Sequence, residues 1–323
     1  MQRSMVMRIS GASSVRRATP ALRRAALTLF LAALVLGSAS AGLASAAHTK
    51  SYLYWTNYGV SGSGGTIGRA GLGGHGINES FISGANGPVG IAVHGGFIYW
   101  SNPGIDANSP GTTIGRARLN GTDVNQSFIT GLNSPHSLAI SGGYIYWDSR
   151  YGNTIGRAAL NGTAVNQDFI TGASGPWGVA IAGHYIYWTN YGAGGGSSGT
   201  TIGRASLDGT AVNQSFITGA SAPAGIAVHK NYIYWSNEGS GQTGTTIGRA
   251  NLDGTAVNES FITGAHAPAG ITVNGGYLYW SNFGSSHGIN GSTIGRARLS
   301  GAGVTQHFIT GAASPAGITT SAG

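Results

Sequence analysis

The apolar residues of this chain come in short runs. Segments rich in Ile, Val, Tyr, Trp and Phe alternate with clusters of Gly, Asn, Asp and Pro, a pattern typical of β-strands separated by tight turns. Over residues 223–264 it predicts four strands, at Gly225–His229, Tyr232–Ser236, Thr246–Leu252 and Glu259–Thr263. Since no segment combines helical apolar spacing with helix caps, the pattern indicates an all-β fold.

This strand pattern recurs six times. Tryptophans that end an aromatic strand stand at positions 55, 100, 147, 188, 235 and 280, at spacings of 45, 47, 41, 47 and 45 residues. Each is followed by a Thr-Ile-Gly-Arg-Ala segment, which begins at positions 66, 113, 154, 201, 246 and 293. Four antiparallel strands repeated six times at this period predict a six-bladed β-propeller.

The two ends of the repeat array complement each other. Tyr52–Trp55 matches the second strand of a blade without its first, and Pro315–Thr319 matches a first strand without its second. Pairing this C-terminal strand with the N-terminal blade would close the ring and leave no unpaired strand edge at the seam.

The repeat resembles the YWTD repeat of low-density-lipoprotein receptor class B. The matching segments are Tyr54-Trp55-Thr56-Asn57 and its counterparts at 99–102 and 187–190, each followed by Ile-x-Arg-Ala-x-Leu-x-Gly and Pro-x-Gly-Ile-Ala patterns. The resemblance covers residues 50–323 and implies a six-bladed propeller that binds a ligand. Two features depart from the family: the final Asp of the motif is Asn or Ser, and no cysteine-rich module flanks the propeller.

The positive charge of the chain is concentrated at its N-terminus. Six arginines and no acidic residue fall within residues 1–46, which leaves +2 of the net +8 for the rest of the chain. A near-neutral body lacks the basic surface that a nucleic-acid-binding protein needs. The arginines precede a twelve-residue apolar run, Ala25–Leu36, and small residues that include Ala44-Ser45-Ala46. This order predicts a cleaved signal peptide over 1–46 rather than a membrane anchor, because twelve residues are too few to span a bilayer.

From this organisation we expect a single propeller domain over 47–323, secreted to the extracellular space, monomeric, and without membrane contact after cleavage. The sequence has no cysteine, no Gly-x-Ser-x-Gly elbow and no paired histidines at metal-ligand spacing, so we assign no catalytic residue, cofactor or metal. The arginine of each Thr-Ile-Gly-Arg-Ala segment recurs in every blade. We therefore expect it to be structural, packed between blades and bonded to carbonyl groups or to Tyr and Asn side chains.

Residues that break the repeat are the candidates for a site. The residue after each blade-opening proline should lie near the central channel; it is Ala in three blades, but His136 and Trp177 in two neighbouring ones. The blade of His136 also carries Asp148 and Ser149 in place of Thr/Ser and Asn, Ser137 in place of Gly, and the shortest loop between its second and third strands. The candidate ligand-binding residues are His136, Asp148, Arg150, Tyr151 and Trp177.

Each of these residues has an ordinary chemical use. An imidazole beside a carboxylate can act as a base, and an exposed tryptophan is a common platform for sugars or apolar ligands. The alternative is that the irregular blade is a packing variant, repacked around a shorter loop.

Three functions remain open from the sequence. The first is a non-catalytic binding module for a protein, glycan or small molecule, contacted at the face that carries the variable loops. The second is an exported propeller enzyme that resembles streptogramin B lyase, a family with seven blades to which only His136 can be loosely matched. The third is a structural surface or matrix protein.

Overall fold

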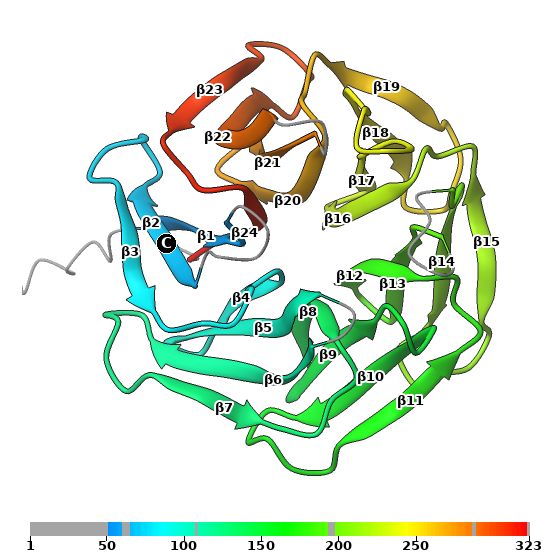
Figure 1. Ribbon diagram of the computed structural model, residues 1–323. Coiled ribbons are helices and arrows are strands. Elements are labelled where there is room, and N and C mark those ends of the chain that lie inside the picture. The colour runs from blue at the N-terminus through cyan, green and yellow to red at the C-terminus, as the bar shows by residue number, and fades with distance from the viewer. Residues whose placement is uncertain (1–50, 60–64, 107–108, 193–197, 286–288, 322–323) are drawn as a thin grey trace, which may run out of the picture. The chain divides into compact units, whose positions relative to one another are not determined.

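The computed structural model describes residues 51–59, 65–106, 109–192, 198–285 and 289–321, and these residues form a six-bladed β-propeller (Figure 1). Each blade is a sheet of four antiparallel strands, as the repeat predicts. The described residues contain no helix that could cross a membrane. The predicted signal peptide lies outside the described residues.

We number the blades 1 to 6 along the chain and give the strands from the innermost outwards. Blades 1 and 2 are formed by β24 Pro315–Thr320, β1 Tyr52–Asn57, β2 Thr66–Gly71 and β3 Asn78–Ser83, and by β4 Ile91–His94, β5 Phe97–Asp106, β6 Ser109–Arg118 and β7 Asn125–Ile129. Blades 3 and 4 are formed by β8 Pro135–Ser141, β9 Tyr144–Ser149, β10 Thr154–Ala159 and β11 Asn166–Thr171, and by β12 Pro176–Ala182, β13 Tyr185–Asn190, β14 Thr201–Ser206 and β15 Asn213–Thr218. Blades 5 and 6 are formed by β16 Pro223–His229, β17 Tyr232–Asn237, β18 Thr246–Asn251 and β19 Asn258–Thr263, and by β20 Pro268–Asn274, β21 Tyr277–Ser285, β22 Ile289–Arg298 and β23 Thr305–Thr310.

The six tryptophans are buried within their own blades because a glycine faces each of them. In blade 4, Trp188 is paired with Gly203 on the next strand and has no exposed surface. A Cβ atom on Gly203 would lie 2.2 Å from the indole ring. The glycine of each Thr-Ile-Gly-Arg-Ala segment is therefore required by the packing of the neighbouring indole.

The hydrophobic core is divided among the six junctions between blades. At the junction of blades 1 and 2, Tyr54 and Ile67 of blade 1 pack with Ile98 and Trp100 of blade 2, and all four are buried. The same combination of a tyrosine and isoleucines from one blade with an isoleucine or leucine and a tryptophan from the next recurs around the ring. Each blade thus buries both of its faces against its neighbours.

The repeated arginines are structural, as expected, and lie at the junctions between blades. Tyr52 and Phe81, the two rings that hold Arg69, pack against the apolar cluster shared by blades 1 and 2. The guanidinium carbon of Arg204 lies 4.6 Å from the centre of the Tyr185 ring and 4.0 Å from that of Phe216, and all three residues belong to blade 4. All six arginines of this series lie between two rings in this way. One ring belongs to the Tyr or Phe that begins the second strand of the blade, and the other to a phenylalanine of the fourth strand. Cation–π contact is thus added to the expected bond to a tyrosine of the neighbouring strand, which Arg204 makes with Tyr187.

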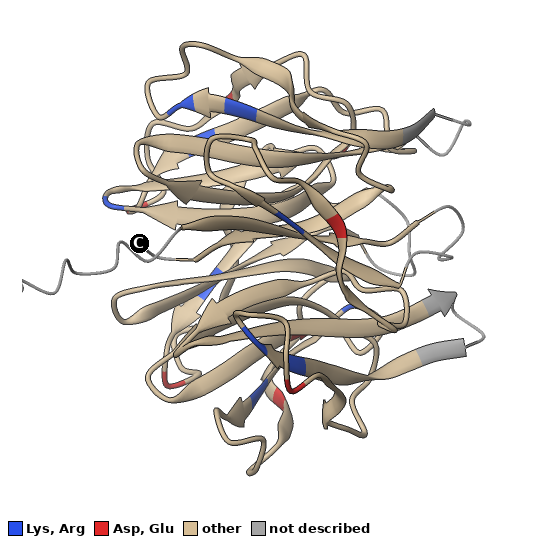
Figure 2. Ribbon diagram, turned by 90° about the vertical axis from the view of Figure 1, so that its left-hand side faces the viewer, with Lys and Arg blue, Asp and Glu red and all other residues tan. Residues whose placement is uncertain are grey.

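The ring closes where the sequence predicts. β24 pairs antiparallel with β1, and Trp55 lies opposite Ile318. Ser321 N–H donates to the Tyr52 carbonyl oxygen at 2.9 Å, which extends this pairing. Charged residues are few and scattered over the blades in Figure 2, in agreement with the near-neutral body of the chain.

The innermost strands of neighbouring blades are joined by a repeated hydroxyl clip. In blade 4, Thr189 Oγ1 accepts the N–H of Gly178 at 2.8 Å and donates to the carbonyl oxygen of Ala224 in blade 5 at 2.6 Å. A Thr or Ser at the same position makes the corresponding pair of bonds in blades 1, 2, 5 and 6. The glycine is needed because a Cβ on Gly178 would lie 2.3 Å from the Ala224 oxygen.

Candidate functional site

The candidate residues come from blades 3 and 4, at one face of the ring. His136 lies at the start of β8, Asp148 lies in β9, Arg150 and Tyr151 follow β9, and Trp177 lies at the start of β12. Pro135 is paired with Ser149, so the start of β8 and the end of β9 meet at the same end of the sheet. Strand topology thus brings His136 and Arg150 to one face although fourteen positions separate them.

Trp177 is at the centre of a group of stacked side chains. Its ring centre lies 4.9 Å from that of His136 and 4.8 Å from that of Tyr191. The guanidinium carbon of Arg150 lies 4.2 Å from the centre of the Trp177 ring and 5.2 Å from that of Tyr191. We call these four residues the Trp177 cluster. His136 and Tyr191 are buried, and no blade other than 3 and 4 has His, Arg or Trp at the positions of His136, Arg150 and Trp177.

The position of Trp177 corrects one expectation. The sequence suggested an exposed tryptophan, but the side chain is half-buried, and its ring is covered by His136, Tyr191 and Arg150. Tyr151 is the exposed member of the predicted set, with 46% of its surface accessible, and its ring centre is 5.6 Å from the guanidinium carbon of Arg150. The accessible edge of the site is therefore formed by Tyr151 and Arg150.

His136 does not pair with Asp148, so the expected combination of base and carboxylate is not formed. The His136 ring is buried and its Nδ1 lies 3.0 Å from the carbonyl oxygen of Ser134. Burial and then the nearby Arg150 charge lower the pKa of His136 to about 3. A neutral imidazole of such low basicity is a poor general base at neutral pH.

Asp148 lies below the surface of the site. It has no exposed area, and its Oδ1 accepts the Ser137 N–H at 2.6 Å. Burial raises the pKa of this carboxyl well above its usual range, against the opposing effects of that hydrogen bond and of Arg150. Asp148 stands at the strand position where the other blades have the Thr or Ser that forms the hydroxyl clip, such as Thr189 in blade 4.

Two residues of the site were not predicted, Tyr191 and Glu238. Each directly follows the last residue of the Tyr-Trp-Thr-Asn-like motif in its blade, as Arg150 does in blade 3. The residues at this position are Tyr58, Pro103, Arg150, Tyr191, Glu238 and Phe283. The position is not part of the repeat, and its only acid is Glu238, so a comparison across the six copies would have found Glu238. Tyr191 would not have been singled out, because Tyr58 stands at the same position in blade 1.

Glu238 is a buried acid near the Trp177 cluster. Only 1% of its surface is exposed. Burial raises the pKa of Glu238 to about 7, against the opposing effects of hydrogen bonds with Gln242 and Tyr191 and of the Arg150 charge. The charge of this group therefore changes near neutral pH.

Blade 3 replaces one set of internal bonds by another. In blade 4, Asn190 Oδ1 accepts the Ser174 N–H, and Gln214 Oε1 accepts the Trp188 indole N–H. In blade 3, where Ser149 replaces the asparagine, Gln167 Oε1 accepts the Asn133 N–H instead. The buried indole nitrogen of Trp147 then has no hydrogen-bond partner within the described part of the chain. The substitutions in blade 3 thus act together.

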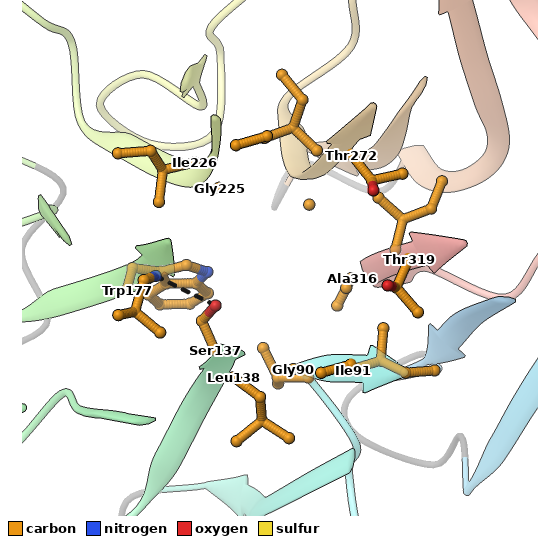
Figure 3. Close-up of a pocket in the computed structure, with 18 of the residues that line it drawn as sticks. Gly90, Ile91, Ser137, Leu138, Trp177, Gly225, Ile226, Thr272, Ala316 and Thr319 are labelled. Carbon is orange, nitrogen blue, oxygen red and sulfur yellow. Dashed lines mark hydrogen bonds between the residues drawn. The ribbon is translucent and has the colours of Figure 1, made fainter. Parts of the chain in front are cut away.

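Beside the cluster, the innermost strands surround a central channel of about 220 Å³. Its wall is mostly aliphatic and is formed by residues such as Ile91, Leu138, Ile226 and Ile318, with Trp177 as the aromatic member (Figure 3). Among the residues expected to lie near the channel, Val89, Trp177 and Ala316 line it, whereas His136 lies behind the wall. The described residues include no group of three or more His, Cys, Asp or Glu side chains arranged to hold a metal ion.

Known structures share this fold. No family model and no curated protein sequence matches the chain. A crystal structure of a nidogen/laminin complex is similar over 84% of this chain and 98% of the other, at 20% identity and a TM-score of 0.61. A streptogramin B lyase structure is similar over 69% of each chain, at 23% identity and a TM-score of 0.50. At these identities the similarity establishes only the fold, a β-propeller.

Proposed function

We propose that the protein is a secreted binding module whose ligand contacts the Trp177 cluster and Tyr151. The observation that carries the proposal is the convergence of non-repeating side chains from two blades, with Trp177 stacked against His136, Tyr191 and Arg150. Aromatic and arginine side chains are the types most enriched at the energetic centres of interfaces. A protein, a glycan and a small molecule all remain possible ligands.

The comparisons support binding more than catalysis. The nidogen/laminin structure is that of a complex, which gives a propeller of this type an interaction role. The similarity to the streptogramin B lyase structure supports a shared fold but not a shared activity, because the two chains are only 23% identical. The low pKa of His136 weighs against a role for that residue as a base.

The binding proposal is tested with two variants of the full protein in a screen of glycans, matrix proteins and small metabolites. Trp177→Ala removes the stacked ring, and we expect it to weaken binding by about 2 kcal/mol, roughly 30-fold. Arg150→Gln should also weaken binding, with little change in the melting temperature. Arg118→Gln is the matched control, because it also removes one positive charge but lies in an exposed ion pair with Asp123.

A ligand that binds Arg150→Gln and Trp177→Ala as tightly as the unaltered protein would place the site elsewhere. Secretion is tested separately by N-terminal sequencing of protein recovered from the medium. We expect a mature end between Gly42 and His48, and secreted material that retained Arg23 would contradict it.

A further inference from the structure

Five of the six junctions between blades carry the hydroxyl clip, and the junction of blades 3 and 4 departs from it. The carbonyl oxygens that accept the clip belong to Val89, His136, Ala224, Ala269 and Ala316. By position, the sixth is the carbonyl oxygen of Trp177. The residue placed to bond it is Asp148, which is paired with Ile155 in the same register as Thr189 with Ile202.

Asp148 makes half of the clip directly. Its Oδ1 accepts the N–H of Ser137, as Thr189 Oγ1 accepts that of Gly178. Its Oδ2 is buried, and the described residues offer it no donor. By analogy with the hydroxyl of the other blades, which bonds both strands, we assign this second oxygen to the side of the Trp177 carbonyl group. Two oxygens that both lack a proton would repel each other in such a buried position.

A proton on Oδ2 resolves this conflict. A neutral carboxylic acid is a donor as well as an acceptor, so it can do what a hydroxyl does in the other blades. We infer that Asp148 is a protonated acid that clips blade 3 to blade 4, with its Oδ2–H donating to the Trp177 carbonyl oxygen, and that loss of this proton loosens the junction beside the Trp177 cluster.

Ser137 supports this assignment independently. In the other blades a glycine stands at its position, and a Cβ there would lie within 2.0 to 2.4 Å of the next blade's carbonyl oxygen. A serine therefore requires a wider separation at this junction. The Ser137 hydroxyl accepts the Val179 N–H of blade 4 at 3.2 Å, as the dashed line in Figure 3 shows. A carboxylic acid is longer than a hydroxyl and can bridge the wider gap.

The charges around Asp148 favour the neutral form. Burial raises the pKa of Asp148, and the three opposing influences are the Ser137 N–H, the backbone N–H of Asp148 itself and the charge of Arg150. His136, on the same strand as Ser137, stays neutral because burial lowers its pKa to about 3. Because the pKa of Asp148 is higher in the folded than in the unfolded state, the stability that the clip contributes is present at low pH. It is lost as the pH rises through the folded-state pKa.

The test compares the unaltered protein with Asp148→Asn and Asp148→Thr. Asparagine retains an uncharged donor and acceptor, and threonine restores the group found in other blades. Infrared spectra at neutral pH are recorded in a Glu238→Gln background, because Glu238 is also a buried acid that titrates near pH 7. They should contain the C=O stretch of a buried carboxylic acid when Asp148 is present, and this band should disappear when Asp148→Asn is added. As the pH is raised, the melting temperature of the unaltered protein should fall relative to both variants.

Backbone exchange locates the effect. At high pH, the amides of Trp177 to Val179 should exchange faster in the unaltered protein than in Asp148→Asn measured at the same pH. The comparison is repeated in a Glu238→Gln background, because Glu238 also titrates near neutral pH. Absence of the acid band, or melting curves that stay parallel across the pH range, would overturn the inference. These measurements use no ligand, so their outcome is independent of the binding proposal.

Discussion

Some glycines of this fold cannot be replaced even by alanine, because the added methyl group has no room. Gly203 lies under the Trp188 indole, so Gly203→Ala places a Cβ 2.2 Å from the ring. We expect a loss of about 3 kcal/mol of stability, since neither the strand pairing nor the buried indole can move far. Thermal or urea denaturation measures it.

The matched control is Gly71→Ala, at the end of the same kind of strand. Its Cβ would lie 3.4 Å from the nearest atom, the carbonyl oxygen of His75, and Ala159 occupies the corresponding position in blade 3. We expect a change within about 0.5 kcal/mol. Equal losses for the two variants would show that the contact with the indole does not limit stability.

The buried carboxyl of Glu238 predicts a pH dependence with a definite sign. Because its pKa is raised from 4.5 to about 7 in the folded state, folding binds a proton between these values. Stability should therefore decrease as the pH rises from about 4.5 through about 7, by an amount on the order of 3 kcal/mol. Glu238→Gln should flatten this part of the profile, as measured by denaturant titration at several pH values. A profile that keeps its slope in the variant would assign the proton to another group.

At the scale of the strand and the blade, we expect that substitutions in blade 3 can raise the stability of the protein. The triple variant Ser137→Gly, Asp148→Thr and Ser149→Asn restores the residues found in regular blades. It should re-form the hydroxyl clip and free Gln167 to accept the indole N–H of Trp147, which now lacks a partner among the described residues. We expect a gain of about 1 to 3 kcal/mol and a higher melting temperature.

Ser149→Asn alone separates the two contributions, because it acts on the indole bond and leaves Asp148 unchanged. If the irregular blade serves binding, the triple variant should gain stability and lose affinity, as often occurs when a functional irregularity is removed. A triple variant that melts below the unaltered protein would mean that the substitutions in blade 3 are already the better packing for its four-residue loop.

The strands themselves follow closely from the sequence. Expected strand Gly225–His229 is β16, Pro223–His229, and expected strand Thr246–Leu252 is β18, Thr246–Asn251. Each pattern is repeated six times, so an error in one copy is corrected by the others. The site was harder to predict because it depends on contacts between blades: His136 of blade 3 stacks on Trp177 of blade 4. The burial of His136 and Asp148 likewise depends on neighbours that spacing alone does not reveal.

For the whole molecule, ring closure by β24 should be a large part of stability. Deleting residues 315–323 removes the innermost strand of blade 1 and exposes the edge of β1 together with the apolar residues that Ile318 packs against, Leu53 and Trp55 among them. We expect a loss of several kcal/mol, enough to unfold a domain of ordinary stability. The measurement is a comparison of melting temperatures.

A circular permutant is the complementary experiment. Joining Ser321 to Tyr52 through a Gly-Gly turn, like the one that links the paired residues Ser141 and Tyr144, and opening the turn at Gly142-Gly143 moves the seam to blade 3 and keeps every strand paired. Both glycines have positive φ and open space around them, so the cut should be tolerated. We expect the permutant to fold with a melting temperature near that of the unaltered protein. Failure of the permutant together with an unaffected truncation would refute closure by strand pairing.

The meeting of Tyr52 and Ser321 also fixes an orientation. β1 begins and β24 ends on the face opposite the Trp177 cluster, because each runs the full height of its blade toward or away from that face. A sensor chip, a bead or a fluorescent protein joined to either strand end would therefore be attached at the face opposite the Trp177 cluster. Tyr151 and Arg150 would then face the solvent. Immobilisation through the chain ends should leave the site open to partners as large as folded proteins, whereas coupling through the loop after β9 should block it.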